Sequence, residues 1–173
     1  MSETEIRVRL SEFRVAPAPA VLKISGLGSC VAVALYDPGL KMGGLAHILL
    51  PGPAPGNRPF ARFSSLSPYK YADQALPALL AAMIREGSAP GRLTAVIAGG
   101  ANMFSVPDER EDLLPLSPGV GKRNVVSVKE HLERLAIRLR GEDVGGGNGR
   151  TVTFDTATGR VEVVTFQGVK MEF

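Results

Sequence analysis

Hydrophobic and polar residues alternate near the start of the chain and then give way to two almost continuous apolar runs. Residues 6–10 alternate aliphatic side chains with arginine, which predicts a strand with one exposed face. The apolar runs at 31–36 and 43–50 predict buried strands. Between them, residues 37–39 read Asp-Pro-Gly, which favours a tight turn. The pattern therefore predicts an antiparallel hairpin.

Further along the chain, the pattern predicts two helices and several more strands. Apolar residues recur at helical spacing over 69–87, where Pro77 is expected to kink the helix or to mark its true start. A second stripe, through residues such as Val128 and Leu139, predicts a helix over 124–140. Other strands are expected at residues 21–26, 93–98, 151–155 and 160–166. Strands interleaved with two helices indicate an α/β or α+β fold with a layered sheet.

Composition narrows the class of protein. With 173 residues, 45% of them hydrophobic and 21% charged, the chain is expected to form one domain over residues 1–173. The segment 51–68, with five prolines and two glycines, is expected to be a surface loop or lid. The net charge of +3 is small and no run of Lys and Arg exceeds two residues, which argues against nucleic-acid binding.

The sequence also predicts a compartment. The acidic N-terminus lacks the apolar segment of a signal peptide. No apolar stretch approaches the roughly 18 residues that span a membrane, so no membrane insertion is expected. One cysteine, Cys30, excludes an internal disulfide and fits a reducing compartment. We expect a soluble cytoplasmic protein.

The cysteine and one of the two histidines lie on the two strands of the predicted hairpin. Cys30 follows a glycine turn at the start of the first strand, and His47 lies within the second. A turn centred near residues 38–41 places Cys30 opposite residue 49, on the same face as His47. Such diagonal neighbours are about 7–8 Å apart between Cα atoms, which side chains can close. A register shift of one residue would put them on opposite faces.

A thiol and an imidazole within reach of each other are the parts of a cysteine hydrolase, with Cys30 as nucleophile and His47 as general base. Gly26 and Gly28 let the backbone bend so that amides near Ser29 and Cys30 can hold an oxyanion. A protonated His47 is expected to lower the pKa of the thiol below its free value of about 8.5. The alternative is a packing role for both side chains.

Other motifs in the chain do not indicate a ligand site. The glycines of 26–31 lack the third glycine of a dinucleotide loop and lead into a strand instead of a helix. Residues 121–123 lack the first glycine and the Ser or Thr of a phosphate-binding P-loop. One cysteine and two distant histidines, His47 and His131, show no metal-ligand spacing, so no metal or other cofactor is expected.

Six short blocks follow one another along the chain, at residues 26–33, 35–38, 43–47, 99–104, 121–125 and 142–146 with 149–150. In this order they resemble the CheD family of chemoreceptor glutamine deamidases. The resemblance covers roughly residues 20–170 and implies a three-layer sandwich like that of glutamine-deamidating toxins. It also implies conversion of glutamines on the cytoplasmic helices of chemoreceptors to glutamates, in bacterial chemotaxis. A CheC-type phosphatase is implied as a further partner that occupies the active-site face.

The resemblance assigns the nucleophile to Cys30 and the general base to His47, in agreement with the residue pattern. The third member of the family site is a threonine six residues before the cysteine, a position held here by Ile24. An aliphatic side chain cannot accept a hydrogen bond from the imidazole. We expect a backbone carbonyl, Ser25 or Ser29 to orient His47 in its place.

The expected site leaves three functions open. The resemblance of the block at 99–104 implies that Asn102 and Phe104, after the strand at 93–98, line its cleft. The first function is hydrolysis of a glutamine amide through a thioester on Cys30. The second is a weak or inactive regulator, disabled by Ile24, that binds receptors or a CheC-type phosphatase through the same cleft. The third keeps the nucleophile but acts on an ester or another amide.

Overall fold

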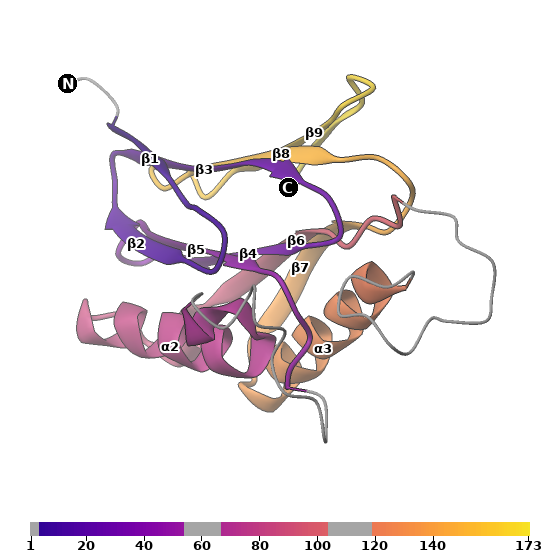
Figure 1. Cartoon of the computed structure of the whole chain (residues 1–173). Coiled ribbons are helices and arrows are strands. Elements are labelled where there is room, and N and C mark those ends of the chain that lie inside the picture. The colour runs from indigo at the N-terminus through magenta and orange to yellow at the C-terminus, as the bar shows by residue number, and fades with distance from the viewer. Residues whose placement is uncertain (1–3, 54–66, 104–118) are drawn as a thin grey trace.

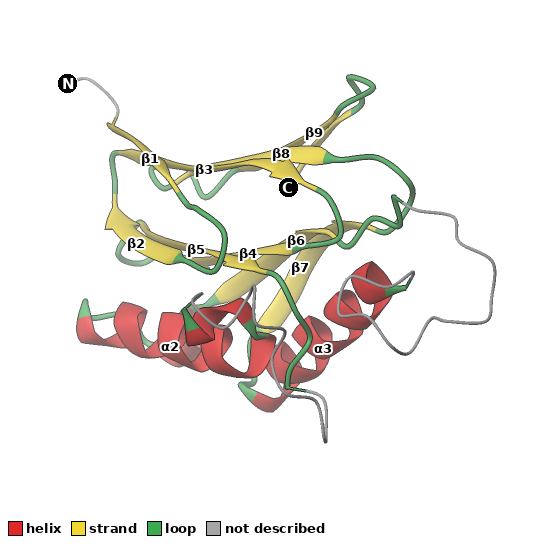
Figure 2. Ribbon diagram, in the orientation of Figure 1, coloured by secondary structure: helices red, strands yellow, loops and turns green. Residues whose placement is uncertain are grey.

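The fold is a stack of three layers, two β-sheets and a layer of helices (Figures 1 and 2). The structure, a computed structural model, describes residues 4–53, 67–103 and 119–173. The first sheet has the order β1 (Thr4–Arg7), β3 (Ala20–Leu27), β8 (Arg150–Asp155), β9 (Val161–Thr165) and β10 (Lys170–Glu172). The second has the order β2 (Phe13–Pro17), β5 (Met42–Ile48), β4 (Val31–Asp37), β6 (Thr94–Gly99) and β7 (Arg138–Val144).

Two helices, α2 (Ala72–Arg85) and α3 (Val120–Arg134), cover the outer face of the second sheet (Figure 1). Short 3₁₀ turns, η1 (Pro68–Lys70) and η2 (Pro90–Arg92), precede α2 and β6. The three-layer sandwich expected from the sequence is confirmed. Among the described residues, neither helix combines the length and the hydrophobicity needed to cross a membrane.

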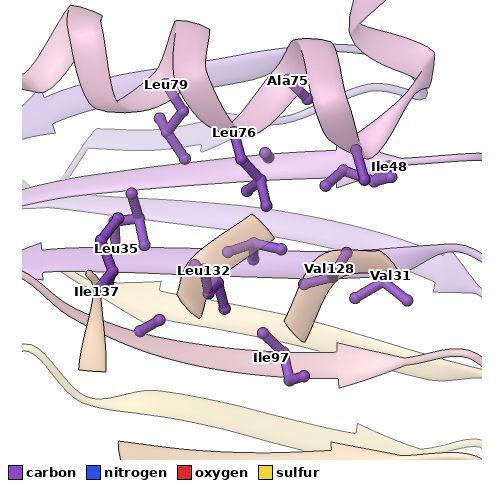
Figure 3. Close-up of a cluster of buried hydrophobic side chains, with 14 of the residues drawn as sticks. Val31, Leu35, Ile48, Ala75, Leu76, Leu79, Ile97, Val128, Leu132 and Ile137 are labelled. Carbon is purple, nitrogen blue, oxygen red and sulfur yellow. The ribbon is translucent and has the colours of Figure 1, made fainter. Parts of the chain in front are cut away.

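Strand β4 lies in the middle of the stack, and its side chains belong to two cores. All seven of its residues are buried. Val31 and Leu35 pack toward the helices, where Figure 3 shows them in one cluster with Leu76 of α2 and Leu132 of α3. The alternate residues, such as Ala32, pack between the two sheets. Burial on both faces explains why this segment is apolar throughout instead of alternating.

The β4–β5 hairpin has the predicted register, with Val31 opposite Ile48. Its turn is held by Asp37, whose side chain is fully buried. The carboxylate accepts hydrogen bonds from Arg92 at 2.9 and 2.8 Å and from the Gly39 N–H at 2.9 Å. The Arg92 hydrogen bond is the main reason that the pKa of Asp37 falls to about 2. The turn therefore fixes how the two strands face each other.

The prediction for the second helix is wrong at its C-terminal end. Helix α3 ends at Arg134, Ala136 adopts a φ of 56°, and β7 begins at Arg138. Leu139 continues the helical spacing but belongs to β7, which pairs in parallel with β6. A short strand after a turn can place an apolar residue at the same interval as a helix does, so periodicity alone did not separate the two.

Other differences from the sequence prediction are smaller. Pro77 lies inside α2, so the alternative that it marks the start of the helix is wrong. Strands β2, β7 and β10 were not predicted, and the strand expected over 6–10 is wrong beyond Arg7, where β1 ends. The four other strand predictions are confirmed with shifts of one or two residues at their ends, by β3, β6, β8 and β9. The lid expected over 51–68 lies largely outside the described residues.

Candidate functional site

Residues 28–30 carry the chain from the first sheet to the second. Strand β3 ends at Leu27 and β4 begins at Val31, so Cys30 lies in a short connection at one end of the sandwich (Figure 1). Cys30 is partly buried, packed against the core between the sheets and against a small cluster that includes Leu49. The only thiol of the protein therefore lies at the boundary between the layers.

All three carbonyl oxygens of residues 28–30 accept hydrogen bonds from elsewhere in the chain. The donors are the Ala101 N–H for Gly28 (3.0 Å), the Asn124 side chain for Ser29 (2.9 Å) and the Gly100 N–H for Cys30 (2.8 Å). Within the described part of the chain, the N–H groups of residues 28–30 donate to no other residue. Unpaired N–H groups beside a nucleophile are the donors that an oxyanion requires.

Two glycines allow the close packing around this connection. Gly99 has a φ of +112°, and a Cβ there would overlap the carbonyl oxygen of Cys30. A Cβ on Gly28 would lie 2.7 Å from the sulfur of Met103. Met103 is also 47% exposed. It therefore lies beside residues 28–30, here called the thiol loop, with part of its side chain open to solvent. Sequence reasoning missed Met103, which lies between the two residues expected to line the cleft.

His47 lies on β5 opposite Ala32 and is 7% exposed. Its backbone N–H donates to the Glu12 carbonyl at 2.9 Å, and its carbonyl accepts from the Ser11 N–H at 3.1 Å. Backbone hydrogen bonds to residues 11 and 12 thus fix the main chain of His47. Its Nδ1 atom is buried and has no hydrogen-bond partner among the described residues.

The register brings Cys30 and His47 to the same face of the hairpin. Cys30 precedes Val31, which pairs with Ile48, so Cys30 and His47 are diagonal neighbours about 7–8 Å apart between Cα atoms. No hydrogen bond joins the thiol and the imidazole in this structure, in which both residues are described. The two residues are therefore neighbours on one face, without a hydrogen bond between their side chains.

Burial keeps both groups neutral near pH 7. Desolvation raises the pKa of the Cys30 thiol to about 11, and the adjacent Cys30 N–H only partly offsets this. Desolvation also lowers the pKa of His47 to about 4, against a smaller opposing effect of the Val8 backbone. The expectation that a protonated histidine lowers the thiol pKa is therefore wrong, because the imidazole is too deeply buried to be protonated at neutral pH.

Of the groups expected to orient His47, the Val8 backbone hydrogen-bonds the ring, whereas Ser25 and Ser29 do not contact it. Ile24 is 1% exposed and belongs to the core between the sheets. Ser25, the next residue on β3, is exposed, as the alternation along a strand requires. No hydrogen bond joins Ser25 or Ser29 to His47 in the described structure. Ser25 lies on the opposite face of β3 from Ile24. Its hydroxyl therefore cannot take the place of a hydroxyl at position 24.

The two predicted cleft residues have different outcomes. Asn102 is exposed, and its backbone N–H donates to the Gly146 carbonyl at 2.8 Å, which places it beside the glycine-rich turn before β8. Phe104 lies outside the described residues. No group of three His, Cys, Asp or Glu side chains in the described ranges is arranged to hold a metal ion.

Sequence reasoning also missed Asn124, which binds the Ser29 carbonyl. The sequence held a signal for it, because Asn124 occupies a stripe of residues spaced by four along α3. The stripe comprises Val120, Asn124, Val128 and Leu132, and all four are buried. A polar residue within a buried stripe indicates a specific hydrogen-bonding role.

The chain matches one family of known proteins. The sequence profile of the family described as CheD chemotactic sensory transduction matches residues 50–165. A protein of Desulforamulus reducens is 44% identical over 161 residues, which cover 93% of this chain and 90% of that protein. A protein of Moorella thermoacetica is 45% identical with the same coverage. Both are named probable chemoreceptor glutamine deamidase CheD.

A third relative, from Clostridium novyi, has the same name and is 42% identical over 95% of both chains. The family profile begins after His47, but the relatives leave so little of this chain unmatched that Cys30 and His47 both fall within the matched span. Among solved structures, the hypothetical protein YfiH of Bacillus licheniformis shares 18% identity, with a TM-score of 0.40, over 76% of this chain and 49% of that protein. This similarity is too low to support an inference about function.

Proposed function

The chain belongs to the CheD family, and on that premise we propose that it deamidates glutamine side chains of chemoreceptors in bacterial chemotaxis, with Cys30 as nucleophile and His47 as general base. The relatives are named for this activity, and this chain aligns with nearly their whole length. The observation that carries the assignment of residues is the hairpin register, which brings the only thiol of the protein and a buried imidazole to one face.

The proposed reaction begins with two neutral groups. As the sulfur of Cys30 attacks the carbonyl carbon of the glutamine amide, Nε2 or Nδ1 of His47 accepts the thiol proton. The oxyanion is held by the N–H groups of residues 28–30, which the described structure leaves without another partner. The imidazolium then gives its proton to the departing ammonia, and a thioester remains. Water activated by His47 hydrolyses the thioester to glutamate and restores the thiol.

Binding of the substrate has to change the surroundings of this pair. The thiol holds its proton far more tightly than the imidazole does in the free protein. An oxyanion forming beside His47 favours the imidazolium, because an opposite charge nearby raises the pKa of a base. Proton transfer is therefore expected to accompany the attack on the amide, without a thiolate present beforehand.

The proposal includes partners and a compartment. The cytoplasmic helices of chemoreceptors are the substrate, and a CheC-type phosphatase is a second partner that would cover the same end of the sandwich. A cytoplasmic location follows from the substrate and is consistent with a single, partly buried cysteine. Exposed Met103 and Asn102, beside the thiol loop, would contact the substrate helix.

A direct assay tests the proposed function. The protein is incubated with the cytoplasmic fragment of a receptor, and ammonia release is measured together with a mass gain of about one unit at each modified glutamine. Wild-type protein is expected to give both signals, and Cys30→Ala neither. A Cys30→Ala variant with full turnover would exclude the thiol as nucleophile. Cys30→Ser, which keeps a hydroxyl, serves as the conservative control.

One observation favours a second candidate, a regulator that binds receptors without turnover. In the described structure, Nδ1 of His47 is buried without a partner, and position 24 offers it only an isoleucine. Under this alternative, wild-type protein binds the receptor fragment stoichiometrically and releases no ammonia.

Methylated receptor tested beside the glutamine form separates amide from ester hydrolysis.

A further inference from the structure

Asn124 is a buried polar residue that the proposed mechanism does not use. It lies near the start of α3 and is fully buried. Its Nδ2 atom donates to the carbonyl oxygens of Ser29 and Leu49, at 2.9 Å in both cases. Because both partners are acceptors only, the NH₂ group has to face them, and the orientation of the amide is settled. One side chain thus holds two segments of the chain together.

The two carbonyls flank the proposed catalytic pair. Ser29 directly precedes Cys30, and Leu49 lies opposite Cys30 when the β4–β5 register is continued by one residue. Leu49 is also two residues beyond His47, directly after the end of β5. The last paired residues of the hairpin are Val31 and Ile48, so Asn124 bridges the strands where their own ladder has ended.

Helix α3 makes two further contacts with this end of the sandwich. A Cβ on Gly121 would lie 2.5 and 2.6 Å from the carbonyl oxygens of Gly100 and Ala101, so the helix packs directly on that loop. The same loop donates the hydrogen bonds that hold the Cys30 connection. Ser127 donates to the Pro51 carbonyl at 2.6 Å. The start of α3 is therefore attached to the loop that holds the Cys30 connection, and Ser127 attaches it separately to the segment after β5.

The Oδ1 atom of Asn124 indicates that the residue has a role beyond stabilising the fold. Its Oδ1 is buried and has no partner among the described residues. A buried acceptor without a hydrogen bond lowers stability, whereas an apolar side chain would suit the stripe formed with Val128 and Leu132. A locally unfavourable residue next to a candidate site is typical of a functional constraint.

We propose that Asn124 is a positioning residue for the reaction, which sets the distance between the Cys30 thiol and the His47 imidazole by tying the Ser29 and Leu49 carbonyls to α3. This inference rests on the proposed function and adds a residue to it. Asn124 touches no reacting atom, so its loss is expected to affect turnover more than substrate binding. A misplacement of about 1 Å in such a pair costs on the order of 100-fold in rate.

The test compares Asn124→Asp with Ser127→Ala. Asn124→Asp keeps the size of the side chain but directs carboxylate oxygens at the two carbonyls in place of donors. Ser127→Ala removes one hydrogen bond from the same helix, to a carbonyl away from the pair. We expect Asn124→Asp to lower kcat about 100-fold with KM within about 3-fold, and Ser127→Ala to leave both within about 3-fold. The loss is expected to diminish at low pH, where a protonated carboxyl donates one hydrogen bond.

A kcat for Asn124→Asp equal to that of Ser127→Ala overturns the inference. The rate of Cys30 alkylation by iodoacetamide tests it independently of turnover. If wild-type protein deamidates nothing, the proposed function fails, yet an alkylation rate changed by Asn124→Asp and not by Ser127→Ala still supports a positioning role. Alkylation rates equal to wild type in both variants exclude it. Should Asn124→Asp not fold, Asn124→Ser, which keeps one donor, is measured in the same way, with an intermediate loss expected.

Discussion

At the scale of single residues, burial decides the chemistry of the candidate pair. Cys30 and His47 both lie where the two sheets meet, and desolvation moves their pKa values in opposite directions, to about 11 and about 4. Both shifts favour the neutral form, since charge is costly in an apolar environment. The free protein therefore holds a thiol and a neutral imidazole, and a pre-formed thiolate–imidazolium pair is not expected.

This state predicts an unreactive thiol in the absence of substrate. We expect iodoacetamide to modify Cys30 more slowly than free cysteine at pH 7.5, with a rate that rises toward pH 11 because only the thiolate attacks. Intact-protein mass spectrometry measures the modification without ambiguity, since the chain has one cysteine. Unfolded protein in urea serves as the control and should react like free cysteine. An inflection below pH 8 in the folded protein would contradict the prediction.

The unpaired Nδ1 atom of His47 predicts a gain from Ile24→Thr, which restores the hydroxyl that the family resemblance implies at this position. We expect kcat for deamidation to rise, because a hydrogen bond to Nδ1 orients the ring and stabilises the imidazolium. Stability is expected to fall by about 1 kcal/mol from the lost apolar volume. Ile24→Val, which removes a methylene without adding a hydroxyl, is the control. Equal kcat in the two variants would show that position 24 does not orient the ring.

At the scale of elements, the β4–β5 hairpin is the unit that brings the pair together. Its register depends on the turn at residues 37–41, where the buried Asp37 carboxylate binds Arg92 and two turn amides. A register shift of one residue would move His47 to the helix side of the sheet, away from Cys30. The turn therefore has an effect on the site from the opposite end of the hairpin.

Asp37→Asn is expected to lower the free energy of unfolding by about 2 kcal/mol, because the variant loses a charge-assisted pair while Arg92, 44% exposed, remains solvated. Urea titration at pH 7 measures the loss. Asp155→Asn is the matched control, since Asp155 accepts the Ala157 N–H at 2.8 Å in the β8–β9 turn without a buried arginine pair. Its expected cost is about 1 kcal/mol or less. Equal costs would mean that the Arg92 pair adds nothing.

At the scale of the whole molecule, the two buried groups make stability depend on pH. The pKa of His47 is lower in the folded than in the unfolded chain, so the unfolded state binds more protons between about pH 6.5 and 4. Stability present above pH 6.5 is therefore lost as the pH falls toward 4. The raised pKa of Cys30 acts at the other end, where stability is lost as the pH rises from about 9 to 11.

We expect a stability plateau between about pH 6.5 and 9, with a loss of roughly 3 kcal/mol on acidification to pH 4. Urea titrations across this range measure it. His47→Gln is expected to flatten the acid limb, because the titrating group is gone, and to leave the alkaline limb unchanged. Cys30→Ser should do the reverse. An acid limb that persists unchanged in His47→Gln would show that carboxylates cause it.

The sequence by itself determined the order of most elements, the hairpin register and the placement of Cys30 and His47 on one face of the hairpin. These depend on local turn chemistry and on a side-chain period of two, which a single segment records. The sequence could not separate the end of α3 from β7, because Leu139 meets both periods.

Only the tertiary structure decided the protonation states of Cys30 and His47 and the contacts that fix the segments carrying them. The pKa values follow from burial between two sheets whose strands come from distant parts of the chain. The exclusion of Ser25 follows from the face of β3 that the second sheet covers. Asn124 reaches the Ser29 carbonyl across 95 residues of sequence. Such long-range contacts leave no local pattern beyond a polar residue in a buried stripe, so packing alone shows what that residue binds.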